Sequence, residues 1–262
     1  MRWRIYRYAY GVFLLSFEPK ITRGKTTLGR LRLVDAFLIH RLRAAVTSGP
    51  FVDLGCGVGG LTTIESRDAL EAAGLNPVIW AIDADPSRLP HVDGILTATE
   101  LEIDQIGVLR AMNVLRQYSA EEARHALADW MSKLSPQGIL VEGTSDKHGE
   151  LAAFFCLGQT HELVLMTTFS RGFGPWMFRD YLPQIWRRTV KPGTELFEFF
   201  EDWDTQFRAQ SGEPDPQSRF FSSLQNLEFD GLVAGRVNGG VFVSLPMSQS
   251  RDGVLSLRRP GV

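Results

Sequence analysis

Residues 51 to 85 place the strongest constraint on how this chain of 262 residues can fold. A short apolar run, Phe51-Val52-Asp53-Leu54, is typical of a buried strand, and the glycine-rich turn 55–60 follows it directly. A helical stretch over about 61–73 then leads to a second apolar strand, 78–82, which ends in Asp83. This order predicts a βαβ unit with two parallel strands that are covered on both faces.

The same alternation of strands and helices continues along the chain. Helical periodicity marks 29–46 and 120–134, and further strands are expected at 94–97, 106–109, 138–142, 162–168 and 239–245. We therefore expect an α/β fold: a Rossmann-like, doubly wound sheet of seven strands, mostly parallel with an antiparallel last strand. The expected divisions are an N-terminal helical segment packed on the core, 1–48, and a Rossmann-like domain, 49–262, with a helical insertion at about 171–226.

The first 17 residues superficially resemble a signal peptide, because arginines at positions 2, 4 and 7 precede a mostly apolar stretch. No small-x-small cleavage site follows, and the stretch is too short to span a bilayer. We expect an amphipathic N-terminal helix, with a weak surface anchor as the alternative, no stable membrane insertion and a cytoplasmic location.

Charge and cysteine content exclude several classes of function. The 28 basic and 30 acidic side chains give a net charge of −2, so we expect no DNA partner. Two cysteines and five histidines without ligand spacing predict a metal-free site in a reducing compartment.

A local basic cluster is either a solvated helix face or a surface for RNA or an anionic substrate. It consists of Arg179, Arg187, Arg188 and Lys191.

The glycine turn and the acid after the second strand together predict a nucleoside site. Glycine lets the backbone approach a ligand closely, and Asp83 can accept hydrogen bonds from both ribose hydroxyls. Gly55, Gly57 and Gly60 also satisfy the pattern of nicotinamide dinucleotide sites. We expect the carboxylate of Asp53 to repel a pyrophosphate and to attract the amino group of a methionine moiety.

Two motifs carry a resemblance to a known family. The sequences D-L-G-C-G-V-G at 53–59 and A-I-D-A-D-P at 81–86 resemble the first and second motifs of class I S-adenosylmethionine-dependent methyltransferases. The resemblance implies S-adenosylmethionine as cofactor, with Asp83 on the ribose and Ala84 or Asp85 beside the adenine. It also implies that the methionine end is contacted by Asp53, Gly55, Gly57 and Gly59.

Two later segments resemble a narrower group. Residues 110–118 and 141–146 are similar to bacterial methyltransferase-like proteins whose substrate is unassigned. In such enzymes the residues after the fourth strand lie beside the methyl donor, and Asn113 is the candidate here. A helix cap before Val114 is an equally weighted alternative for Asn113.

The expected activity is transfer of a methyl group to an unidentified acceptor, most simply a small molecule. Three residues at the end of the fifth predicted strand or after it are candidates for a general base: Glu142, Asp146 and His148. Each is also explained as a solvated charge in a loop. No catalytic residue is therefore assigned. Cys56 is expected to be a buried filler rather than a nucleophile. The alternatives are a nicotinamide-dependent oxidoreductase and a non-catalytic module that binds S-adenosylmethionine.

Overall fold

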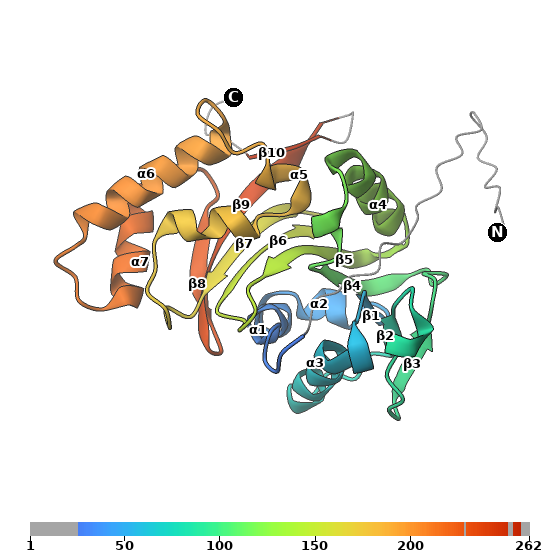
Figure 1. Ribbon diagram of the computed structural model, residues 1–262. Helices are drawn as coiled ribbons and strands as arrows, with labels where there is room; N and C mark the ends of the chain where they lie inside the picture. The colour runs from blue at the N-terminus through green and yellow to red at the C-terminus, as the bar shows by residue number, and fades with distance from the viewer. Residues whose placement is uncertain (1–25, 228, 251–253, 258–262) are drawn as a thin grey trace.

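One mixed sheet of ten strands organises the chain. The computed structural model describes residues 26–227, 229–250 and 254–257, so the helix expected within the first 17 residues lies outside them. The strands lie in the order β10-β9-β7-β6-β5-β4-β1-β2-β3, and β8 pairs with β9 (Figure 1). Their bounds are β1 Phe51–Leu54, β2 Ile79–Ile82, β3 Ile95–Ala98, β4 Ile106–Met112, β5 Leu134–Ser145, β6 Leu151–Leu157, β7 His161–Thr167, β8 Val233–Val237, β9 Gly240–Gln249 and β10 Leu255–Leu257.

The first five strands make the parallel half of the sheet. β1 pairs in parallel with β2 on one side and with β4 on the other, and β3 and β5 extend the two edges. This order, 3-2-1-4-5, is that of a doubly wound fold, in which the chain reverses direction across the sheet between β1 and β4. Ligands bind such sheets outside the carboxyl ends of the strands at that point.

The other half is antiparallel and larger than the single last strand that we expected. β5, β6, β7 and β9 pair antiparallel in turn, and β8 and β10 add to β9. The prediction of seven strands is therefore wrong, because the described part of the chain has ten. The sequence analysis missed β6, whose residues are all buried. A continuous apolar run without alternation does not distinguish a central strand from a buried helix.

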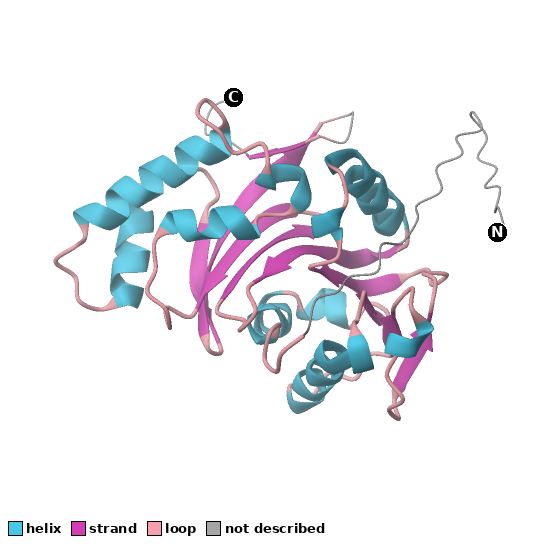
Figure 2. Cartoon of the chain, in the orientation of Figure 1, coloured by secondary structure: helices cyan, strands magenta, loops and turns pink. Residues whose placement is uncertain are grey.

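Helices cover both faces of the sheet, as the strand alternation predicted (Figures 1 and 2). One apolar core cluster contains side chains of α1 and α3. The other contains side chains of α4, α6 and α7, including the fully buried Trp203. The helical bounds are α1 Arg32–Arg41, α2 Arg43–Val46, α3 Leu61–Ala72, α4 Ala120–Ser132, α5 Gln184–Arg187, α6 Glu195–Ala209 and α7 Pro216–Gln225.

Two predicted boundaries change. The helix expected over 29–46 is interrupted at Leu42, whose φ of −125° separates α1 from α2. The stretch 135–138, which we expected to end a helix, belongs to β5. Within the described residues no helix is both long and apolar enough to cross a membrane.

Candidate functional site

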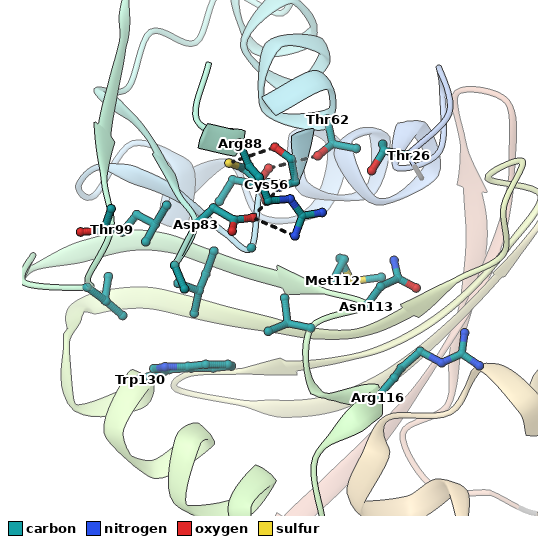
Figure 3. Close-up of a pocket in the computed structure, with 18 of the residues that line it drawn as sticks. Thr26, Cys56, Thr62, Asp83, Arg88, Thr99, Met112, Asn113, Arg116 and Trp130 are labelled. Atoms are coloured by element: carbon teal, nitrogen blue, oxygen red, sulfur yellow. Dashed lines mark hydrogen bonds and ion pairs between the residues drawn. The ribbon is translucent and has the colours of Figure 1, made fainter. Parts of the chain in front are cut away.

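A pocket of about 640 Å³ opens at the carboxyl ends of the parallel strands. Its walls come from the segments that follow β1, β2, β3 and β4, together with residues just before α1 and two residues of α4. In Figure 3, Thr99 and Trp130 lie toward one end of this pocket and Asn113 and Arg116 toward the other. The pocket is thus at the switch point at which a doubly wound sheet binds its ligand.

The turn after β1 depends on glycine. Gly55 and Gly57 have φ of 74° and 71°, in the left-handed region that side chains avoid, and both line the pocket. A Cβ on Gly55 would come within 2.7 Å of the Val114 side chain, so this position is also closed sterically. Gly59 has a φ of 68° but does not line the pocket, unlike the other predicted glycines.

The amide groups of this turn are largely used within the protein. The amides of Gly55 and Cys56 donate to the carbonyl of Ile82, at 2.7 and 3.1 Å. The amide of Gly57 donates to Asp83 Oδ2 at 3.0 Å. A pyrophosphate bound over a glycine turn relies on free amides that point at it. These three amides point at β2 and its terminal acid instead.

Asp83 lies at the end of β2, beside the glycine turn, as predicted. Its Oδ2 accepts from Gly57 and its Oδ1 from the amide of Asp85, at 3.1 Å. The guanidinium of Arg88 lies 3.8 Å from Oδ2, and Figure 3 shows it next to Asp83 in the pocket. A carboxylate has about four lone-pair sites, so Asp83 retains acceptor capacity toward a ligand.

Asp53 is part of a buried ion network rather than an unpaired charge. Arg110 Nε donates to Asp53 Oδ1 at 2.9 Å, and Arg110 Nη2 lies 2.8 Å from Oδ2. The hydroxyls of Thr62 and Thr63 donate to Oδ2 at 3.2 and 2.6 Å. Asp53 still contributes to the pocket wall, but Arg110, which also pairs with Asp35, offsets part of its charge. The repulsion of a pyrophosphate that the sequence predicts is therefore weakened.

Arg110 also joins this network to the N-terminal helix. Its Nη1 donates to Asp35 Oδ1 and to Ser66 Oγ, both at 2.6 Å, and the side chain has no solvent exposure. Burial lowers the pKa of Arg110, but the carboxylates of Asp53 and Asp35 outweigh this effect and hold the pKa above its ordinary value. Burial raises the pKa of Asp35 to about 6 despite the pairing with Arg110. The network ties β1, β4, α1 and α3 together behind the turn.

Asn113 lies at the end of β4 and lines the pocket. Its Nδ2 donates to Ser145 Oγ at 3.2 Å, and its Oδ1 accepts from the Ser145 amide at 3.3 Å. The residue has a φ of 65°, an uncommon conformation that asparagine tolerates best after glycine. The alternative of a helix cap is wrong, because the short helix η3, Leu115–Gln117, starts after Val114 without a side-chain cap.

The three candidates for a general base do not reach this pocket. Glu142 is buried within β5, where burial raises its pKa to about 8. The Asp146 carboxylate accepts from the amides of Glu150 and Leu151 at 2.7 and 3.1 Å, which closes the β5–β6 hairpin. His148 is exposed in that hairpin. These positions are structural or solvated.

Cys56 lines the pocket but is not a nucleophile. Its side chain is buried, and burial together with the charges of Asp53 and Asp83 raises its pKa to about 12. At neutral pH the thiolate is absent, and only the thiolate reacts. The expectation of a buried filler is confirmed.

Sequence reasoning missed several residues of the pocket. Arg30, Arg88, Arg116 and Trp130 all line it. Arg88 and Arg116 follow β2 and β4 closely, so their distance from the strand ends was a usable signal. Arg30 and Trp130 come from helical regions whose approach to the pocket depends on tertiary packing.

The four residues of the predicted basic cluster have different surroundings. Arg179 Nη2 donates to the carbonyl of Val190 at 3.4 Å, and Arg188 and Lys191 are exposed. Arg187 is half-buried and close enough to Arg116 for its charge to lower the pKa of that residue, after the larger effect of burial. Only Arg187 is thereby connected to the pocket.

Comparisons with known proteins give structural neighbours only; no family model and no curated protein matches the sequence. Magnesium protoporphyrin IX methyltransferase (ChlM) from Synechocystis PCC 6803 with bound SAH, S-adenosylhomocysteine, is 12% identical, with 83% of this chain and 82% of that one covered and a TM-score of 0.36. The CcbJ methyltransferase from Streptomyces caelestis is 17% identical over 51% of this chain and 59% of that one, with a TM-score of 0.30. LepI in complex with SAM, S-adenosylmethionine, is 18% identical over 47% of this chain, with a TM-score of 0.34.

The match to LepI spans about a third of the LepI chain, 33%. These neighbours are methyltransferases or complexes with S-adenosylmethionine or S-adenosylhomocysteine. All three TM-scores are below 0.5, so the function of this chain is argued from its own pocket.

Proposed function

We propose that this chain is a methyltransferase that binds S-adenosylmethionine in the pocket at the carboxyl ends of β1, β2 and β4. The observation that carries the proposal is the pairing of Asp83 with a glycine turn in which the amides of Gly55, Cys56 and Gly57 already have partners inside the protein. Such a turn admits a nucleoside and offers fewer amides to a pyrophosphate.

Each wall of the pocket has a proposed role. Asp83 holds the ribose hydroxyls, while Gly55 and Gly57 leave room for the methionine end. Asn113, fixed by Ser145, lies beside the methyl group. Asp53 acts from behind the turn, because Arg110 occupies its carboxylate. Gly59 keeps the backbone conformation of the turn without touching the ligand.

The chemistry requires little from the protein beyond alignment. When bound, the cofactor would supply a methyl group on a cationic sulfur. The sulfur would keep the electron pair of the broken carbon–sulfur bond, and the acceptor would release a proton after it has bonded to the methyl carbon. Asn113 is held by Ser145 on the pocket wall, and alignment of the two reactants beside it would supply a large part of the rate acceleration. A base in the bulk or on the acceptor itself takes the proton.

A nicotinamide-dependent oxidoreductase is the second candidate, favoured by one observation. The guanidinium of Arg88 lies beside Asp83 and within 3.9 Å of a Cβ built on Gly57. An arginine at this point of a dinucleotide site can bind the 2′-phosphate of a nicotinamide cofactor. The module that binds S-adenosylmethionine without catalysis shares every contact of the first proposal and differs only in turnover.

Calorimetry with a matched pair of glycine variants tests the first proposal. Gly57→Ala and Gly59→Ala both place a side chain at positive φ, at a cost of about 1–2 kcal/mol each, and neither clashes with the protein. Only Gly57 lines the pocket. We expect Gly57→Ala to weaken S-adenosylmethionine about tenfold or more and Gly59→Ala to leave its affinity unchanged.

Titration of the wild type with S-adenosylmethionine, S-adenosylhomocysteine and both nicotinamide dinucleotides separates the candidates. Binding of a dinucleotide without any response to S-adenosylmethionine overturns the methyltransferase proposal. Equal loss of affinity in both glycine variants would mean that the ligand does not contact the turn.

A further inference from the structure

Two arginines from separate parts of the chain lie on the wall of the pocket, and the charge of a third acts on one of them. Arg30 precedes α1, Arg116 lies in η3, and Arg187 ends α5. Arg30 and Arg116 line the pocket, and Figure 3 shows Arg116 at the same end of it as Asn113. The fold therefore gathers positive charge at one end of the cavity and leaves Asp83 toward the other.

The hydrogen bonds of these arginines leave donors unused. Arg30 Nε donates to Ser145 Oγ and to the carbonyl of Asp146, and Nη2 donates to the carbonyl of Ser145, all at 3.3 Å. These bonds fix the side chain against the end of β5. A guanidinium carries five N–H donors. Within residues 26–227, 229–250 and 254–257 the structure records no hydrogen bond or ion pair for Arg116, and none for Nη1 of Arg30.

The three charges also oppose one another. Burial lowers the pKa of Arg30, and the charge of Arg116 lowers it further. Burial and then Arg187 lower the pKa of Arg116, against smaller effects of Tyr181 and Asp180 that raise it. The Asp146 carboxylate near Arg30 is already occupied with the amides of the β5–β6 hairpin. Like charges held close together cost free energy, and functional sites are where proteins keep them.

We propose that the methyl acceptor is a small anion whose carboxylate or phosphate group is bound between Arg30 and Arg116 at this end of the pocket, with the charge of Arg187 behind Arg116. The role of this anion as methyl acceptor rests on the proposed function, whereas the binding of an anion at this place does not. The planar guanidinium fork matches both groups through two parallel hydrogen bonds. Met112, Val114 and Tyr118 supply apolar wall next to the charge and would cover the body of such a molecule.

The test is calorimetry with benzoate, its uncharged counterpart benzamide and inorganic phosphate, on the full chain alone and saturated with S-adenosylhomocysteine. The variants are Arg116→Gln and Arg187→Gln. Arg188→Gln is the matched control, because Arg188 directly follows Arg187 but is exposed and is not among the charges that shift the pKa of Arg116. We expect at least one of the two anions to bind, with affinity about tenfold above that of benzamide, since charge-assisted hydrogen bonds contribute at least this much.

In Arg116→Gln and Arg187→Gln that anion should bind about tenfold more weakly, and in Arg188→Gln its affinity should change less than twofold. A preference for phosphate over benzoate, or the reverse, tells which acid group the site takes. Equal binding of benzoate and benzamide with no response to phosphate, or equal loss in all three variants, overturns the proposal.

A second measurement excludes the carboxylate of the cofactor itself as the anion. S-adenosylhomocysteine should keep its affinity in Arg116→Gln, as should 5′-methylthioadenosine, which lacks the amino acid part. Loss of S-adenosylhomocysteine alone, or displacement of benzoate by it, would assign the arginines to the cofactor and overturn the acceptor proposal but leave the methyltransferase proposal standing. If the wild type binds neither cofactor form, the methyltransferase proposal fails, and the titrations of the chain alone still decide the anion site.

Discussion

Arg110 and Arg116 are six residues apart in the chain, yet their surroundings are opposite. Arg110 is completely buried and meets two carboxylates, Asp35 and Asp53, at 2.6 and 2.8 Å. Arg116 lies on the wall of a cavity, and the charges nearest to it include two further arginines. A buried arginine with two acidic partners holds the fold together. Arginines that repel one another at a pocket are explained by a negatively charged ligand.

Arg110→Leu should have the largest effect of the changes that separate these two roles. It leaves two carboxylates buried without their cation, which costs about 3–5 kcal/mol of unfolding free energy. Denaturant titration measures the loss, with Arg67→Leu as control because the pair Arg67–Asp68 is at the surface. An exposed pair contributes at most about 1 kcal/mol. Similar losses in both variants would refute the structural role of Arg110.

Glu142→Gln tests the opposite case to Arg110, a buried ionisable group without a partner of opposite charge. No ion pair to Glu142 is recorded among the described residues. Burial raises its pKa from 4.5 to about 8, so the folded state holds a proton that the unfolded state releases. The contribution of the protonated carboxyl group to the unfolding free energy is therefore complete below pH 4.5, and it is lost as the pH rises to about 8. The glutamine variant should be more stable than the wild type by roughly 2–4 kcal/mol above pH 8 and similar to it near pH 4.

Measuring the unfolding free energies of both proteins across this pH range checks the prediction for Glu142. Asp35 is common to the two proteins, so its titration cancels in the difference. A difference that does not depend on pH would show that Glu142 titrates normally in the folded state.

Asp53→Asn tests whether Asp53 stabilises the fold, as Arg110 does, or contacts the ligand. From sequence alone we expected its charge to attract the amino group of the cofactor. Because Arg110 occupies the carboxylate, the substitution should lower the unfolding free energy by about 1.5–3 kcal/mol, the range for hydrogen bonds to charged groups. The affinities for S-adenosylmethionine and adenosine should change in parallel. A selective loss of S-adenosylmethionine in a protein of normal stability would restore the direct contact.

Arg116→Gln should have the smallest effect on folding. Arg116 has no recorded hydrogen bond or ion pair among the described residues and is repelled by two arginines, so its removal should change the unfolding free energy by no more than about 0.5 kcal/mol. Thermal and denaturant unfolding beside Arg110→Leu give the contrast directly. A loss of several kcal/mol would place Arg116 with Arg110 among the residues that hold the fold.

The predictions from sequence succeeded where the signal is local. The turn after β1 has glycine at the positive φ angles of Gly55 and Gly57, and Asp83 ends the next strand beside it, as the motif order implied. The parallel strands were predicted because their apolar runs alternate with helical periodicity. The β5–β6 hairpin was missed because β6 is buried on both faces and therefore has no period of two.

The amino-acid sequence by itself thus determined the parallel half of the sheet, the glycine turn and the acid that faces it, since each depends on residues close together in the chain. Only the tertiary structure decided which charges are neutralised. Asp53 looks like a free carboxylate until Arg110, 57 residues later, is found paired with it. Likewise, Arg30 and Arg116 meet at one pocket only because the segments before α1 and after β4 come together in the fold. Electrostatic energy depends on distance in space and on burial, and neither can be read from spacing along the chain.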